Sequence, residues 1–184
     1  MSLQHINVKF FVDGALPVEE EEFINLFHRW VAEQSTNELL IDVADYRHVP
    51  NGPSVVLVGL EAHYVLDNSQ GRCGLLYNRV GTLDGSDEDR MSQAVHAAVS
   101  ACQRLEQAFE GLRFKRNEFQ ILVNDRLVQA SGEEAEAKAG IESFVTRSLE
   151  CSGAEFKYEG DKRCRIGCVV QLAQPLEFEK LVAV

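Results

Sequence analysis

The chain has 184 residues, 45% of them hydrophobic, which is enough for one globular domain that folds without a disulfide or a metal. Its net charge of −11, from 18 basic and 29 acidic residues, argues against nucleic acid and anionic membrane as partners. Five cysteines without CxxC spacing indicate reduced thiols. The sequence has neither a signal-peptide pattern nor an apolar stretch of the roughly 18 residues that span a bilayer. We therefore expect a soluble, cytoplasmic protein of bacterial type.

The N-terminal half predicts one helix within a run of strands. Residues 5–12 alternate apolar and polar side chains, which is typical of a strand. Glutamates 19–22 then precede an apolar i, i+3, i+4, i+7 stripe, so we expect a helix whose acidic first turn complements its dipole. Short turns separate the strands that follow, which favours antiparallel neighbours. These strands are predicted at residues 38–48, 54–59, 63–67 and 73–80.

The C-terminal half predicts two helices and further strands. Ser86 and Asp89 resemble a capping box, and an apolar stripe after them indicates a long helix that stops near Gly111. Ser131 and Glu134 are placed to begin the next helix. Strands are predicted at residues 119–124, 155–158 and 164–172, the last two as a hairpin, and the apolar tail 175–184 predicts an edge strand.

The resulting order is β-α-β-β-β-β-α-β-α-β-β, which lacks the regular alternation of a parallel α/β fold. We predict a single α+β domain over residues 1–184, with three helices packed on one face of a mostly antiparallel sheet. The segments INVKFFVDG and FQILVNDR each precede an acidic helix start and a hairpin. This echo suggests a weak internal β-α-β-β duplication.

The best candidate for a binding site is the polar end of the strand in IDVADYRHVPNGP, residues 41–53. Asp42 and His48 share a strand face but lie roughly 20 Å apart, so they cannot form a dyad. A pocket must therefore draw on neighbouring strands, with an arginine as a possible anion anchor. The predicted ligand-binding residues are Asp45, Tyr46, His48, His63, Asn78 and Arg79. The alternative interpretation is structural, with Asp45 paired to Arg47 or Arg79 and His48 in a turn.

Motifs for other chemistry are missing. The sequence has no GxGxxG, GxxxxGK[ST] or GxSxG pattern, and no histidine spacing typical of a metal site. Cys73 lies beside Arg72, which could lower its thiol pKa, although a buried thiol is the favoured interpretation. We predict no metal and no cofactor, and we assign no catalytic residue.

Two functions remain as hypotheses. The favoured one is a non-enzymatic interaction or assembly protein that forms a homodimer through its apolar tail and an edge strand. The alternative is a small-molecule-binding protein or enzyme with its pocket at the end of the strand meander in residues 39–80. The sequence is compatible with an enzyme and with a non-enzymatic protein.

Overall fold

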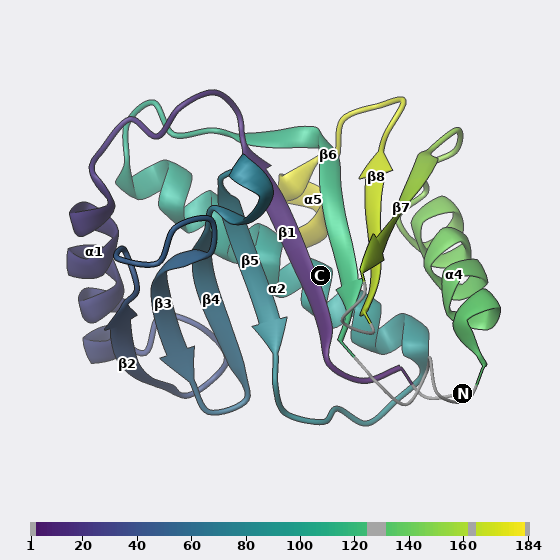
Figure 1. The fold of residues 1–184 in the computed structure, drawn as a ribbon, viewed down its shortest axis with the longest axis horizontal. Coiled ribbons are helices and arrows are strands. Elements are labelled where there is room, and N and C mark those ends of the chain that lie inside the picture. The colour runs from purple at the N-terminus through teal and green to yellow at the C-terminus, as the bar shows by residue number, and fades with distance from the viewer. Residues whose placement is uncertain (1–2, 125–131, 162–164, 183–184) are drawn as a thin grey trace.

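An eight-stranded antiparallel sheet runs through the computed structural model, which describes residues 3–124, 132–161 and 165–182 (Figure 1). The order across the sheet is β2-β3-β4-β5-β1-β6-β8-β7. The strands are β1 (Ile6–Val12), β2 (Leu40–Asp45), β3 (Pro53–Gly59), β4 (Ala62–Asp67), β5 (Gly74–Arg79), β6 (Phe114–Val123), β7 (Glu155–Asp161) and β8 (Arg165–Gln171). The predicted α+β class and the order of its elements are confirmed.

The helices share one hydrophobic core with the sheet. They are α1 (Glu20–Glu33), α2 (Asp87–Ala108), α4 (Glu134–Ser143) and the short α5 (Phe178–Val182), with a 3₁₀ turn η1 (Ser69–Gly71) and a π-helical turn η2 (Phe144–Ser148). In Figure 1, α2 lies behind the sheet, α1 lies beside the β2 edge and α4 lies beside the β7 edge. None of the helices in the described ranges is long and apolar enough to cross a membrane.

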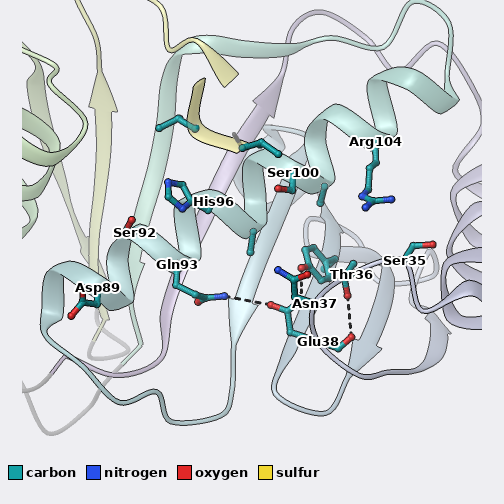
Figure 2. Close-up of a pocket in the computed structure, with 15 residues that line it drawn as sticks. Ser35, Thr36, Asn37, Glu38, Asp89, Ser92, Gln93, His96, Ser100 and Arg104 are labelled. Carbon is teal, nitrogen blue, oxygen red and sulfur yellow. Dashed lines mark hydrogen bonds between the residues drawn. The ribbon is translucent and has the colours of Figure 1, made fainter. Parts of the chain in front are cut away.

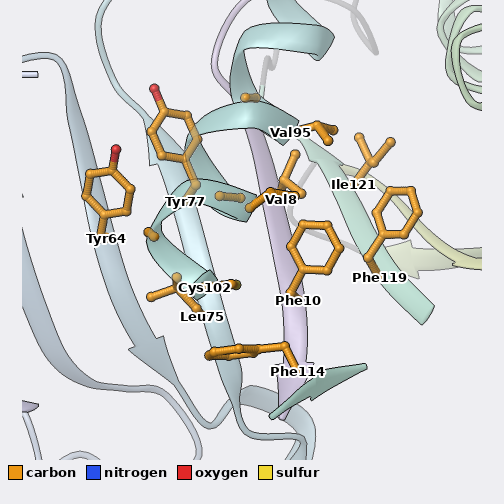
Figure 3. Close-up of a cluster of buried hydrophobic side chains, with 14 of the residues drawn as sticks. Val8, Phe10, Tyr64, Leu75, Tyr77, Val95, Cys102, Phe114, Phe119 and Ile121 are labelled. Carbon is orange, nitrogen blue, oxygen red and sulfur yellow. The ribbon is translucent and has the colours of Figure 1, made fainter. Parts of the chain in front are cut away.

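The core lies between α2 and the central strands (Figure 3). Val8 and Phe10 of β1 alternate with polar residues, so they project toward α2 while Lys9 projects to the opposite sheet face. Phe119 of β6 stacks on Phe10 with ring centroids 5.4 Å apart. Cys102 of α2 is fully buried in this layer. The period-two and helical patterns in the sequence therefore identify the two sides of one core.

The start of α2 confirms the predicted capping box. The Asp89 backbone N–H donates to Ser86 Oγ at 3.1 Å, and the Ser86 N–H donates to Asp89 Oδ2 at 2.8 Å. The helix ends at Ala108, and Gly111 follows with a φ of 84°, which favours glycine. For the third helix, the structure has no side-chain cap at Glu133, and the predicted cap Ser131 lies outside the described residues.

The tail is the main correction to the predicted fold. Residues 178–182 form the helix α5 rather than an edge strand. Phe178 is fully buried, its ring lies edge-on at 5.0 Å from Phe10, and the Arg116 guanidinium lies over the Phe178 ring, 3.5 Å from its centroid. A short apolar run does not distinguish a strand from a helix by periodicity alone, and packing against the core decides between them.

The connectivity repeats in two units that meet at the centre of the sheet. In the first unit, the chain passes from β1 through α1 to the edge strand β2 and returns strand by strand to β5. In the second unit, it passes from β6 through α4 to the edge strand β7 and returns to β8. The first strands of the units pair antiparallel, with Val8 opposite Ile121. This arrangement agrees with the predicted β-α-β-β echo, and common ancestry of the units stays a prediction.

Candidate functional site

The structure separates the six predicted site residues into two groups. Asp45 lies opposite Val55 at one end of the β2-β3-β4-β5 meander, and Tyr46 and His48 lie in the turn that follows β2. The second group lies at the opposite end of the same strands, where His63 pairs with Asn78 and Ala62 pairs with Arg79. Because the strands are antiparallel, the start of β4 and the end of β5 lie beside the start of β2 and not beside its end, so the two groups do not form one pocket.

The first group is an exposed turn. The Arg47 guanidinium bonds to the Asp45 carboxylate at 2.7 Å and, through hydrogen bonds from its side chain and backbone, lowers the pKa of Asp45 to about 2. The rings of Tyr46 and His48 lie 6.2 Å apart, and all four side chains are exposed. This is the Asp45–Arg47 charge pair that the sequence offered as the structural alternative.

The second group stabilises a loop. Arg79 is buried and donates hydrogen bonds to the Gly81 carbonyl at 3.1 Å, the Thr82 carbonyl at 3.3 Å and the Glu61 carboxylate at 3.1 Å. His63 accepts a hydrogen bond at Nδ1 from the Gly59 N–H at 3.3 Å. Arg79 is thus engaged by protein oxygens and is not available as the predicted anion anchor.

A cleft of about 550 Å³ opens elsewhere, between α2 and the segment that precedes β2 (Figure 2). The α2 wall is a polar stripe at helical spacing that extends over four turns. The polar residues that line the cleft are Ser35, Thr36, Asn37, Glu38, Asp89, Ser92, Gln93, His96, Ser100 and Arg104, and Leu181 and Val182 of α5 add an apolar margin. The cleft therefore lies on the helix side of the meander.

Glu38 forms the floor of this cleft and is only 6% exposed. Its Oε2 accepts a 2.7 Å hydrogen bond from the Tyr64 hydroxyl, and its Oε1 accepts a 3.0 Å bond from the Tyr77 hydroxyl. The Gln93 amide donates to the Tyr77 oxygen at 2.9 Å and reaches Glu38 Oε1 at 3.4 Å. Within the described ranges, no lysine, arginine or histidine forms an ion pair with Glu38. The hydrogen bonds that Tyr64, Tyr77 and Gln93 make to the buried carboxylate thus come from neutral side chains, while the buried Arg79 acts on Glu38 only through its charge at longer range.

The electrostatics keep both phenols protonated. Burial, reinforced by the Glu38 charge, raises the pKa of Tyr77 from 10.0 to about 12. The same two causes raise the pKa of Tyr64 further. Burial lowers the pKa of His96, which favours the neutral imidazole. The cleft therefore contains hydroxyl donors, a neutral imidazole and a carboxylate in its floor.

Three cysteines in the described ranges, Cys73, Cys102 and Cys151, are not activated. Burial raises the pKa of the Cys73 thiol to about 11, against the opposing effect of the Lys9 charge. Burial also raises the pKa of Cys102 and of Cys151. These groups are therefore thiols at neutral pH. Cys164 lies outside the described residues.

Sequence reasoning missed Glu38 because it was assigned to a strand, but a signal for it was present. Tyr64 and Tyr77 alternate in phase with the core residues of adjacent strands, and a buried phenol usually requires a hydrogen-bond partner. His96 and Arg104 fall outside the apolar stripe of α2, which was visible in the sequence as well. The local pattern of these three segments does not show that they meet in the fold.

Comparison of the chain with known proteins finds no matching family model and no curated protein of significant sequence similarity. In the part of the chain that the structure describes, no group of three or more His, Cys, Asp or Glu side chains is arranged to hold a metal ion. The case for function therefore depends on the geometry of the cleft.

Proposed function

We propose that this protein binds a small polar molecule in the cleft between α2 and residues 35–38, with the Glu38 carboxylate as the principal recognition group. The observation that carries the proposal is a carboxylate that is 6% exposed and has only neutral hydrogen-bond donors. Burying a charge without an ionic partner is costly. A carboxylate offers about four acceptor sites, so the three donors present leave room for one more. A ligand that donates to Glu38 would fill it.

This proposal retains the small-molecule hypothesis from the sequence and moves the site. The pocket lies against the helix face of β4 and β5, where Tyr64 and Tyr77 project, and not at the strand ends. Its polar lining favours a ligand with several hydrogen-bonding groups over an apolar one.

A ligand screen by nuclear magnetic resonance tests the proposal. Small polar metabolites are added to labelled protein, and shifts of the amides of residues 35–38 and of the α2 stripe report binding. Glu38→Gln keeps the shape but removes the charge, so we expect it to weaken the affinity of a cationic ligand at least about tenfold. Glu110→Gln, an exposed change outside the cleft, is the matched control. Ligands that shift only amides far from the cleft, or that bind Glu38→Gln equally well, would contradict the proposal.

Self-association is a second candidate function, and one specific surface favours it. Leu39, Ile41 and Leu60 are 57%, 52% and 61% exposed, and the Leu60 N–H donates to the Leu39 carbonyl at 2.9 Å, so these two residues are adjacent. Exposed apolar side chains grouped in this way mark contact surfaces. A homodimer would use these side chains, because the tail that the sequence offered for pairing is packed as α5.

The backbone edge of β2 offers less to such a dimer. The Gln34 amide bonds to the Leu40 N–H at 3.0 Å and to the Leu40 carbonyl at 2.9 Å. The Asp42 carboxylate accepts the Val43 N–H at 2.8 Å. Side chains of the same chain thus bond to backbone N–H and C=O groups of β2 that another strand would need for pairing. Protection of this kind is found in edge strands that avoid aggregation. Light scattering of the wild-type protein and of Leu60→Glu tests the dimer: a monomer at high concentration would exclude it.

We also propose a cytoplasmic location. Cys73, Cys102, Cys151 and Cys168 are thiols and not disulfides. Thiols persist in reducing compartments. Alkylation of the protein in intact cells, followed by mass analysis of these four residues, tests the location, since disulfides there would contradict it.

A further inference from the structure

From the distribution of charge along the cleft, we infer that its ligand is a zwitterion: a small aliphatic molecule whose protonated amine binds Glu38 and whose carboxylate binds Arg104. This inference rests on the proposed function, since it names the class of molecule for the same cleft. It requires a cation site and an anion site at different positions, joined by a surface that suits methylene groups.

Glu38 supplies the cation site. An ammonium group would give the buried carboxylate a direct ionic partner, which Arg79 does not, because it acts on Glu38 only at longer range. Hydrogen bonds from an ammonium to a carboxylate are charge-assisted and stronger than those of neutral donors. The Tyr64 and Tyr77 hydroxyls bond to the carboxylate from the sheet side and hold it in place at the cleft floor. A hydroxyl ligand would fill the same acceptor site but would leave the buried carboxylate without a direct ion pair. The floor of the cleft therefore favours an amine.

Arg104 supplies the anion site. It lies eleven residues beyond Gln93 on the same stripe of α2, which is about 16 Å along the helix axis. Figure 2 shows its guanidinium directed toward the segment that carries Ser35 and Thr36, across the cleft. Although the chain carries 29 acidic residues, none of those in the described ranges forms an ion pair with Arg104. A guanidinium is a good partner for a carboxylate because its fork matches both oxygens.

The surface between the two ends suits an aliphatic spacer. Ala97 and Ala101 of α2 and Leu181 and Val182 of α5 line the cleft. Ser100 lies among them on the α2 stripe, and Ser35, Thr36, Asn37, Ser92 and His96 add polar groups along the same cleft, so the spacer has apolar contacts on one side and polar groups on the other. The cleft thus places a carboxylate and a guanidinium apart, with an apolar margin, which is the complement of an ω-amino acid.

A matched set of probes tests this arrangement by isothermal titration calorimetry. The probes are the ω-amino acids from β-alanine to ω-aminododecanoate, with the alkylamine and the alkanoate of equal chain length for each. We expect one chain length of ω-amino acid to bind best. That compound should bind about fivefold more tightly than its alkylamine, which is the gain expected for an exposed ion pair. The alkanoate should bind most weakly, because it brings a like charge toward Glu38.

Variants assign each end of the ligand. Arg104→Gln should abolish the advantage of the ω-amino acid over the alkylamine and leave alkylamine binding unchanged. Glu38→Gln should weaken both compounds at least about tenfold. Arg29→Gln is the matched control, because Arg29 is exposed on α1 and outside the cleft. Circular dichroism of each variant verifies that it is folded.

Two results would overturn the inference and can be distinguished from failure of the proposed function. If alkylamines bind as tightly as ω-amino acids and Arg104→Gln changes nothing, the zwitterion is wrong while the cleft remains a binding site. If no probe binds but the metabolite screen finds a ligand that depends on Glu38, the ligand class is again wrong. If neither the probes nor the screen finds a ligand in the cleft, both proposals fail.

Discussion

The hydroxyl of Tyr64 donates a 2.7 Å hydrogen bond to Glu38, a residue 26 positions earlier in the chain. This bond ties the segment before the edge strand β2 to the inner strand β4. Through Tyr77 and Gln93, the same carboxylate is connected to β5 and α2. The floor of the cleft is therefore a junction of four separate segments, and its geometry depends on the whole first unit of the fold.

Removal of the Tyr64 hydroxyl should destabilise the protein. In Tyr64→Phe, Glu38 stays buried but loses its shortest donor, so we expect the free energy of unfolding to fall by about 1–3 kcal/mol. Urea unfolding followed by circular dichroism measures the change. Tyr46→Phe is the control, because that ring is exposed after β2, and it should change stability by less than about 0.5 kcal/mol. Equal stability of the two variants would show that the Tyr64–Glu38 hydrogen bond makes no net contribution to the free energy of unfolding.

Tyr77 should make stability fall at high pH. Its pKa is raised from 10.0 to about 12 in the folded protein, so the folded state holds the phenol proton more tightly than the unfolded state. The stabilisation is fully present below about pH 10 and is lost as the pH rises through about 12. Ultraviolet titration of tyrosinate in wild-type protein and in Tyr77→Phe measures the deprotonation of the phenol that causes this loss. The variant should lack one late-titrating phenol, and an unchanged late phase would contradict the assignment.

A buried ion pair lies on the sheet face opposite α2, where Lys9 Nζ and Asp67 Oδ2 are 2.6 Å apart. Because both side chains are almost fully buried, Lys9→Met leaves an uncompensated carboxylate and should cost about 3–5 kcal/mol. The double variant with Asp67→Leu should recover part of that loss. Lys180→Met removes an exposed pair with Glu177 and should leave the free energy of unfolding nearly unchanged. Denaturant unfolding measures the stability of each variant. A double variant no more stable than Lys9→Met alone would contradict the explanation.

Gly74 should tolerate no side chain. A Cβ at this position would lie 2.5 Å from the Phe10 carbonyl oxygen of the neighbouring strand, so Gly74→Ala should separate β5 from β1 and cost at least about 1–3 kcal/mol. Gly140→Ala provides the opposite case, since nothing lies within 4 Å of its Cβ and it is inside α4. That change should stabilise the protein by about 0.4–1 kcal/mol. Thermal unfolding of both variants tests the contrast, which fails if the two changes have the same sign.

Much of the fold was predictable from local pattern. The alternation in residues 5–12 identified β1, and Ser86 with Asp89 identified the first turn of α2, because both signals depend on side chains close together in sequence. The tail was predicted wrongly because the apolar side chain of Phe178 suits a strand or a helix equally well by itself. Phe178 packs against Phe10 from the helix α5, and this tertiary contact decides between the two structures.

The candidate site was much less predictable. The polar run at Asp45, Tyr46 and His48 attracted attention because its residues are adjacent in sequence, yet the structure leaves them exposed in a turn. The residues that do meet, Glu38 and Gln93, are 55 positions apart. Nothing in the local pattern of either one indicates the other.

The sequence by itself determined the α+β class, the antiparallel connections and the faces of β1 and α2, since these follow from backbone periodicity and short turns. Only the tertiary structure decided that the floor of a cleft forms where Glu38 meets Tyr64, Tyr77 and Gln93. The physical reason is that a buried carboxylate needs hydrogen-bond donors. In this chain the donors come from strands and a helix whose proximity depends on the register of the complete sheet.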